Sequence, residues 1–154
     1  AFTFGQRLPD ILQLQSEDLQ IMPQTKSLCV TIRRGKVIRW VQPYCLHLPI
    51  ETALAETLLE IRAERKLGQT LFNETTLPIA RGILKAHNEN LEIRSVRRGG
   101  LQALALLGID IPELRRNFSK HSTDQMLLRY LCHGAFLLAQ ANLHHHTAEK
   151  LLNC

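Results

Sequence analysis

The sequence predicts an α+β fold that is mostly α-helical and carries one small antiparallel β-sheet. Apolar residues recur at helical spacing over most of the chain, and one stretch has the composition of a β-hairpin. The 154 residues, 45% of them hydrophobic and 21% charged, are enough to bury a core without disulfides. No run of about 18 apolar residues could span a bilayer. We therefore expect one globular domain over residues 1–154.

The first half of the chain should hold a short helix, a hairpin and two longer helices. Leu8, Ile11 and Leu12 have helical spacing, which places Arg7 at a helix start. The β-rich runs 27–32 and 37–41 flank a turn, which predicts a hairpin with a wholly basic tip. The remaining features in order are an extended exit between Pro43 and Pro49, a helix from Ile50 to near Gly68, and a helix over residues 76–87 followed by a polar loop.

The second half should consist of short helices. Apolar spacing and the breaker Gly108 separate them, and no repeat or linker divides the chain. The predicted helices cover residues 95–107, 111–117 and 122–131, and a last one lies within 135–152.

Basic residues are concentrated in two segments. Residues 26–39 carry a net charge of +5 and residues 94–130 carry +4, while the rest of the chain sums to −4 and the total is +5. Such segments are typical of a surface that faces a polyanion, although a solvated charged face fits the composition equally well.

The cysteines and the histidine run do not predict a metal site. Cys29, Cys45, Cys132 and Cys154 show no CxxC spacing and no secretory segment precedes them, so we expect reduced thiols without chemistry in an intracellular protein. Adjacent helical residues point in different directions, so we interpret His144 to His146 as surface residues and expect no bound metal.

Four matches occur in order in the segment IRSVRRGGLQALALLGIDIPELRRNFSKHSTDQMLLRYL. Arg97 lies in an R-x-x-R box, Gly108 closes the following helix, His121 lies in a second box, and Tyr130 follows His121 by nine residues. This pattern resembles the active-site half of the tyrosine recombinases, the phage-integrase superfamily. Upstream, GQRLPDILQL is similar to the family's box for its first catalytic arginine, here Arg7, with Asp10 where an acidic residue is usual.

The resemblance implies the fold of a recombinase catalytic domain, without the N-terminal core-binding domain, that breaks and rejoins DNA. Arg7 and Arg97 would clamp one phosphate, His121 would donate a hydrogen bond to it, and Tyr130 would be the nucleophile. A phenol becomes a good nucleophile when nearby cations favour its phenolate. Lys36 at the hairpin tip would protonate the leaving oxygen, although some members of the family carry this lysine where Arg33 stands.

Two positions depart from the family pattern. Arg94 replaces the usual histidine of the first box, and an arginine cannot easily act as a general base. Lys120 replaces the glycine before His121 and adds a phosphate-directed charge. We include Arg94 in the catalytic set as a phosphate ligand, and leave open whether the chain is an active divergent enzyme or a decayed copy from a mobile element.

The expected partners are double-stranded DNA and further copies of the chain, in a tetramer on DNA. No membrane, nucleotide or other cofactor is implied, and the protein should be DNA-associated in a nucleus or a bacterial cytoplasm. The last helix could dock in cis or in trans.

Two alternative functions remain, namely type IB topoisomerase-like relaxation and a non-catalytic helix-turn-helix module over residues 101–117. The candidate DNA contacts are Arg33, Arg34, Arg98, Arg115, Arg116 and Lys120.

The central expectation is geometric. We predict that the guanidinium groups of Arg7 and Arg97, the His121 ring and the Tyr130 hydroxyl converge on one basic concavity.

Overall fold

The computed structural model describes residues 3–131, 141–142 and 144–146, and it has an α+β architecture with one three-stranded antiparallel sheet. The described residues form two compact units. Unit 1 comprises Gln6–Ser95, and unit 2 comprises residues 3–5 together with the described residues from Val96 onward. None of the helices in these described residues is long and apolar enough to cross a membrane.

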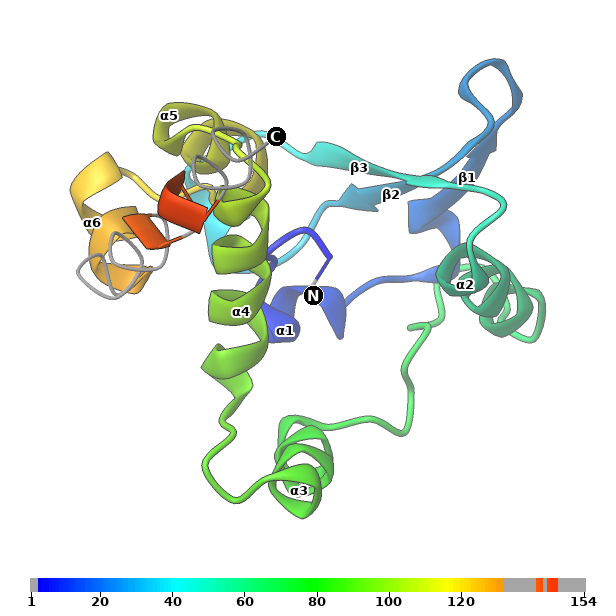
Figure 1. Cartoon of the computed structure of the whole chain (residues 1–154). Helices are drawn as coiled ribbons and strands as arrows, with labels where there is room; N and C mark the ends of the chain where they lie inside the picture. Colours follow the sequence, from blue (N-terminus) through cyan, green and yellow to red (C-terminus); the bar gives the residue numbers. More distant parts are fainter. Residues whose placement is uncertain (1–2, 132–140, 143, 147–154) are drawn as a thin grey trace. The chain divides into compact units, whose positions relative to one another are not determined.

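The sheet forms the centre of unit 1. Its strands are β1 (Leu19–Met22), β2 (Ser27–Ile32) and β3 (Tyr44–Pro49), in the order β1-β2-β3 (Figure 1). Every residue of β2 is buried, whereas β3 alternates between buried and exposed residues. The alternation gives β3 one face toward the core and one toward solvent. The buried apolar residues of this unit are Leu14, Leu19, Leu28, Cys29, Val30, Ile32, Leu46, Leu48, Ala55 and Leu71.

The predicted hairpin is confirmed in its first strand and wrong in its second. Residues 27–32 form β2, but Val37–Arg39 forms a 3₁₀ turn, and the partner strand is β3, which we had expected to be an extended exit. Residues 37–41 lack a regular apolar alternation, and Trp40 is 84% exposed. By contrast, Leu46 and Leu48 of β3 are two residues apart and both buried. Strand β1 was missed because it is short and runs directly into Pro23.

The helices of unit 1 match their predicted positions closely. Helix α1 (Leu8–Ile11) begins at Arg7 as expected, and α3 (Leu77–His87) follows an N-cap at Thr76. Helix α2 (Ala53–Ala63) starts at the N-cap Thr52 and ends five residues before Gly68. A 3₁₀ turn, η1 (Ser16–Asp18), leads into β1, and a second one, η2 (Pro23–Thr25), joins β1 to β2.

Unit 2 is helical. Helix α4 (Ile93–Leu106) begins three residues before the unit boundary, and α5 (Ile111–Glu113), a π-helical segment (Leu114–Ser119) and α6 (Asp124–Tyr130) follow it. The positive φ of 91° at Gly108 ends the first helix as the sequence predicts. The buried core of this unit consists of Leu101, Ala105, Leu114, Leu127 and Leu131.

The start of the chain packs on this core. Gly5 has φ +59°, and a Cβ there would overlap the Leu101 side chain, so only glycine fits both the conformation and the space. The predicted C-terminal helix within 135–152 lies mostly outside the described residues, of which 141–142 and 144–146 are helical.

Candidate functional site

Tyr130 is the centre of a cluster in unit 2. It is the last residue of α6, whose first turn is capped by Thr123. The guanidinium carbons of Arg97 and Arg98 lie 5.4 Å and 5.8 Å from the centroid of the Tyr130 ring. The His121 ring lies 5.2 Å away from it, centroid to centroid, at a tilt of 49°. Two cations and an imidazole therefore surround the phenol that the sequence predicts to be a nucleophile.

Arg97 is fixed by the protein rather than by solvent. Its side chain is only 8% exposed, and its Nη2 donates a hydrogen bond to the carbonyl oxygen of Ser119 at the end of the π-helical segment. Together with the Tyr130 ring, this carbonyl fixes the plane of the guanidinium. Such preorganisation is what stabilisation of a developing phosphate charge requires.

The same turn presents His121. Lys120 adopts the left-handed conformation with φ 53°, and its backbone N–H donates to the carbonyl oxygen of Arg115 at 2.8 Å. Burial lowers the pKa of the Lys120 ammonium. The side chain of Lys120 folds back so that its Nζ donates to the carbonyl oxygen of Arg116.

His121 is neutral near pH 7. Burial, and secondarily the charge of Arg97, lowers its pKa to about 4. Its Nδ1 is buried and has no hydrogen-bond partner among the described residues, and the same holds for Nε of Arg98. Because a neutral imidazole keeps one N–H, His121 can donate a hydrogen bond but brings no charge of its own.

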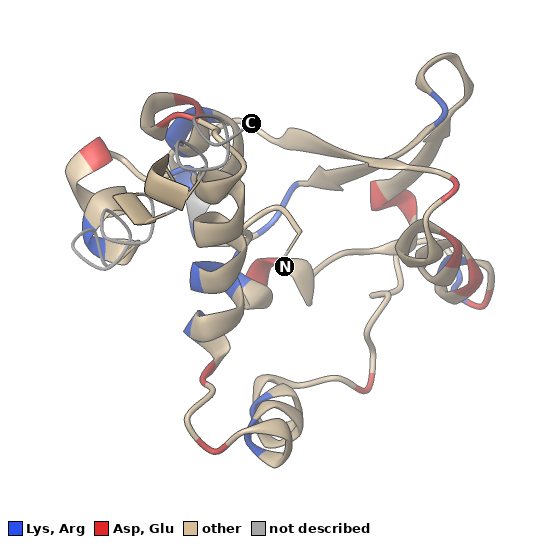
Figure 2. Cartoon of the chain, viewed as in Figure 1, with Lys and Arg blue, Asp and Glu red and all other residues tan. Residues whose placement is uncertain are grey.

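The basic residues of α4 lie in its first half (Figure 2). Arg94 is exposed and precedes the buried Arg97 by three residues, so both project from the same side of the helix. Arg98 is half-buried and faces the Tyr130 ring. Arg94 is thus exposed to solvent, whereas Arg97 is largely buried and held by the Ser119 carbonyl and the Tyr130 ring.

The other predicted catalytic residues line a cavity in unit 1. The cavity has a volume of about 530 Å³ and includes both Arg7 at the start of α1 and Lys36 in the turn after β2. Arg7 Nη1 forms an ion pair with Oδ1 of the buried Asp10 at 3.3 Å. The remaining lining residues are Pro9, Asp10, Gln13, Gly35 and Arg39. Arg7 and Lys36 are 29 positions apart in the sequence, and the fold brings these two residues to one cavity.

The turn that carries Lys36 is shaped by Gly35. This glycine has φ +119°, and a Cβ on it would overlap the Asp10 carboxylate. Lys36 itself is exposed. Asp10 therefore touches both the first arginine and the backbone next to the lysine.

Arg33 and Arg34 are ion-paired within the chain. Arg33 Nε lies 3.0 Å from Oδ1 of Asp18, and Arg34 Nη1 lies 2.5 Å from Oδ2 of the same carboxylate. Asp18 has no exposed surface. Asp18 could not be predicted, because nothing in the sequence pattern indicates that it pairs with arginines that lie 15 and 16 positions further along the chain.

The two candidate DNA contacts in the π-helical segment, Arg115 and Arg116, differ in their surroundings. Arg115 Nε donates to Oδ1 of Asp124, whereas Arg116 is exposed. Their DNA-binding role stays a prediction.

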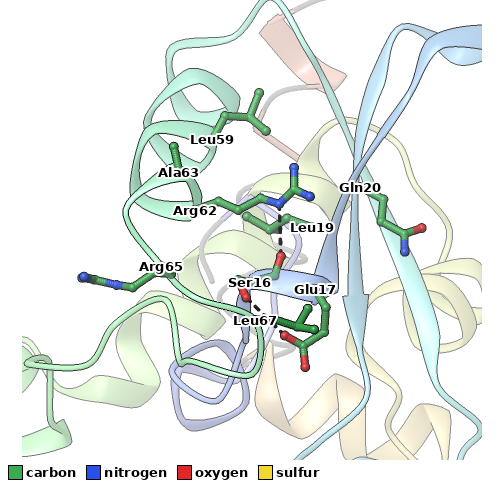
Figure 3. Close-up of a pocket in the computed structure, with 9 residues that line it drawn as sticks. All are labelled: Ser16, Glu17, Leu19, Gln20, Leu59, Arg62, Ala63, Arg65 and Leu67. Carbon is green, nitrogen blue, oxygen red and sulfur yellow. Dashed lines mark hydrogen bonds between the residues drawn. The ribbon is translucent and has the colours of Figure 1, made fainter.

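A second cavity of unit 1, of about 400 Å³, holds none of the predicted site residues. Figure 3 shows the Arg62 side chain directed toward Ser16, where its Nε donates to the backbone oxygen at 3.2 Å, while Arg65 points away. Leu19 and Leu59 form part of its apolar wall. This cavity lies where α2 meets η1, and its contacts fix η1.

The structure describes two of the four cysteines and the histidine run, to which we assigned no chemistry. Burial raises the pKa of the Cys29 thiol, whereas Cys45 is exposed, and Cys132 and Cys154 lie outside the described residues. His144 to His146 are helical and exposed. Within the described parts of the chain, no group of three or more His, Cys, Asp and Glu residues could hold a metal ion.

Comparison of the chain with family models, with curated proteins and with solved structures finds no match. The resemblance to the tyrosine recombinases therefore rests on the sequence residues quoted above. The predicted convergence of Arg7 with Arg97 and Tyr130 stays a prediction.

Proposed function

We propose that this chain is a tyrosine recombinase catalytic domain, which cuts and rejoins DNA through a transient 3′-phosphotyrosyl bond. The observation that carries the proposal is the Tyr130 cluster in unit 2, where Arg97, Arg98 and a neutral His121 surround the phenol. The cavity that joins Arg7 and Lys36 in unit 1 supports it independently.

In the proposed reaction, Oη of Tyr130 attacks the scissile phosphorus and the P–O5′ bond breaks. Charge builds up on the non-bridging oxygens, and the guanidinium groups of Arg97 and Arg7 stabilise it through paired hydrogen bonds. His121 donates its one N–H to the same oxygens. The Lys36 ammonium gives its proton to the departing O5′. Because the phosphotyrosyl bond conserves the energy of the diester, a new 5′-hydroxyl can reverse the step without metal or nucleotide.

Arg94 is the departure that bears most on activity. It is exposed on the same side of α4 as Arg97 and can add a phosphate contact, but it cannot take a proton as a histidine would. In the proposed enzyme the phenol proton leaves to solvent, and the surrounding cations favour the phenolate. A chain that binds DNA without cutting it is the competing outcome.

The test is covalent trapping on nicked suicide duplexes of randomised sequence, with the adduct detected after denaturation. We expect an adduct whose DNA is attached to the peptide that contains Tyr130, and we expect Tyr130→Phe to abolish it. Tyr44, the second tyrosine of the chain, donates to Gln6 Oε1 and provides the matched control, because Tyr44→Phe should keep the adduct. DNA binding without any adduct would indicate a non-catalytic module, and relaxation of plasmids that lack a specific site would indicate a topoisomerase.

A further inference from the structure

The carboxylate of Asp18 connects two distant segments of unit 1. It is fully buried and accepts three hydrogen bonds, from Arg33 Nε at 3.0 Å, from Arg34 Nη1 at 2.5 Å and from the backbone N–H of Gln15 at 2.9 Å. Arg34 Nη2 also donates to Oε1 of Gln15. Arg33 and Arg34 are the first two residues after β2, so this carboxylate holds the start of the turn that carries Lys36.

The segment on which Asp18 lies is itself anchored. The Ser16 hydroxyl donates to the carbonyl oxygen of Lys66 at 2.9 Å, and the Ser16 N–H donates to that of Gln69 at 3.0 Å. Arg62 Nε donates to the Ser16 carbonyl in the cavity of Figure 3. Backbone N–H donors, its own and that of Gly68, lower the pKa of the adjacent Glu17. Turn η1 is therefore held in place by hydrogen bonds to Arg62 of α2 and to the residues that follow α2.

The turn is held at two places. Asp18 holds Arg33 and Arg34 on one side of Gly35, and the Asp10 side chain packs against Gly35 itself. Lys36 follows directly and is exposed, so no packing of its own side chain fixes its position. The backbone on its N-terminal side is what limits where its ammonium can lie.

We infer that Asp18 is a positioning residue, which acts through Arg33 and Arg34 to hold the Lys36 turn in place for proton transfer to O5′. This inference rests on the proposed function for the proton transfer, and on the ion pairs alone for the ordering of the turn. Arg33 and Arg34 then have a structural role as partners of Asp18, in place of the DNA contacts that the sequence suggests. Neither Asp18 nor the two arginines is required to touch DNA.

Two measurements on the full chain test the inference, with Asp18→Asn as the variant. The first is ¹⁵N relaxation of the Gly35 and Lys36 backbone, where we expect order parameters of about 0.8 in the wild type to fall below about 0.6 in the variant. The control is Glu92→Gln, because Glu92 also bridges two basic side chains of unit 1, Arg81 and Lys85. This control should leave the turn unchanged.

The second measurement is cleavage of suicide DNA in which sulfur replaces the bridging O5′. A thiolate leaves without being protonated, so a defect in proton delivery disappears on this substrate. We expect Asp18→Asn and Lys36→Ala to cut ordinary DNA about 10- to 100-fold more slowly and to approach the wild-type rate on the sulfur substrate. Arg97→Lys should stay slow on both substrates.

Each outcome decides the inference. Unchanged order parameters in Asp18→Asn, or a cleavage defect that sulfur does not correct, would overturn it. If the wild type cuts neither substrate, the proposed function fails, and the order parameters alone still decide whether Asp18 orders the turn. If Asp18→Asn does not fold, Arg33→Gln and Arg34→Gln break the same ion pairs from their half-exposed side and should give the same results.

Discussion

The two units hold their basic residues in different ways. In unit 1, Arg7, Arg33 and Arg34 form ion pairs with Asp10 and Asp18, carboxylates that are at most 3% exposed. In unit 2, Arg97 and Arg98 contact the Tyr130 ring, and Arg97 also donates to a backbone carbonyl. These partners in unit 2 are uncharged, whereas a carboxylate cancels much of the positive charge of a guanidinium. Net charge along the sequence therefore does not tell which arginines can bind a phosphate.

The largest effect expected from this comparison is on Arg97. Arg97→Lys keeps the charge but loses the planar fork that binds the Ser119 carbonyl and two phosphate oxygens, so adduct formation should slow about 10²- to 10³-fold. Arg94→Lys is the control, because Arg94 is exposed on the same side of α4 and should change the rate less than tenfold. Rates of adduct formation on suicide DNA measure both. Equal losses of rate in the two variants would show that the buried Arg97 contributes no more to adduct formation than the exposed Arg94.

The next prediction separates structural arginines from DNA-facing ones. Arg34→Gln should lower the free energy of unfolding by about 2 kcal/mol, because a bond to the buried Asp18 carboxylate is lost. The salt dependence of DNA binding should not change. Arg116→Gln should leave the free energy of unfolding unchanged, because Arg116 is exposed. It should reduce the slope of log K for DNA binding against log salt concentration by about 1. Denaturant titration and DNA binding at several salt concentrations test the pair, and a reduced slope in Arg34→Gln would contradict the assignment.

A third prediction uses the pH dependence of unit 2. The pKa of His121 is about 4 in the folded chain and 6.5 is its ordinary value, so between these values the unfolded chain binds more protons. The stability linked to this group is complete above pH 6.5 and is lost as the pH falls toward 4. Because the ring is only half-buried, we expect the loss to be about 1 kcal/mol, well below the ceiling set by the shift. Denaturant titrations at pH 7 and pH 4.5 should show a smaller loss in His121→Gln than in the wild type.

The smallest effect is expected for an ion pair between partly exposed residues. Arg115 and Asp124 are 30% and 47% exposed, so Asp124→Asn should change the free energy of unfolding by less than about 0.5 kcal/mol. The same substitution at the buried Asp18 should cost several times more. Denaturant titration of both variants makes the comparison, and similar losses would show that burial does not set the strength of these pairs.

The elements whose signals are local could be predicted from the sequence. Helix α3, helix α4 and its terminator Gly108, and strand β2 all follow from spacing and breakers within a few residues. Strand β3 was missed because its pairing with β2 is a tertiary contact, and the β-branched residues at 37 and 38 competed with it in the sequence.

The candidate site could likewise be predicted only in part. Tyr130, His121 and Arg97 were named from the resemblance to the tyrosine recombinase pattern, and the structure brings these three side chains together in unit 2. Asp18 could not be named, because an acidic residue in a polar stretch has no signature until the fold brings Arg33 and Arg34 to it.

The central claim is that Arg97, beside Tyr130 in unit 2, stabilises charge on the scissile phosphate. The most direct measurement is adduct formation on suicide DNA whose scissile phosphate is replaced by an uncharged methylphosphonate, because a neutral centre needs less cationic stabilisation. The account predicts that Arg97→Ala loses the adduct on ordinary DNA and regains it on this substrate. No recovery on this substrate, or equal recovery when the methylphosphonate is placed at the neighbouring phosphate, would contradict it.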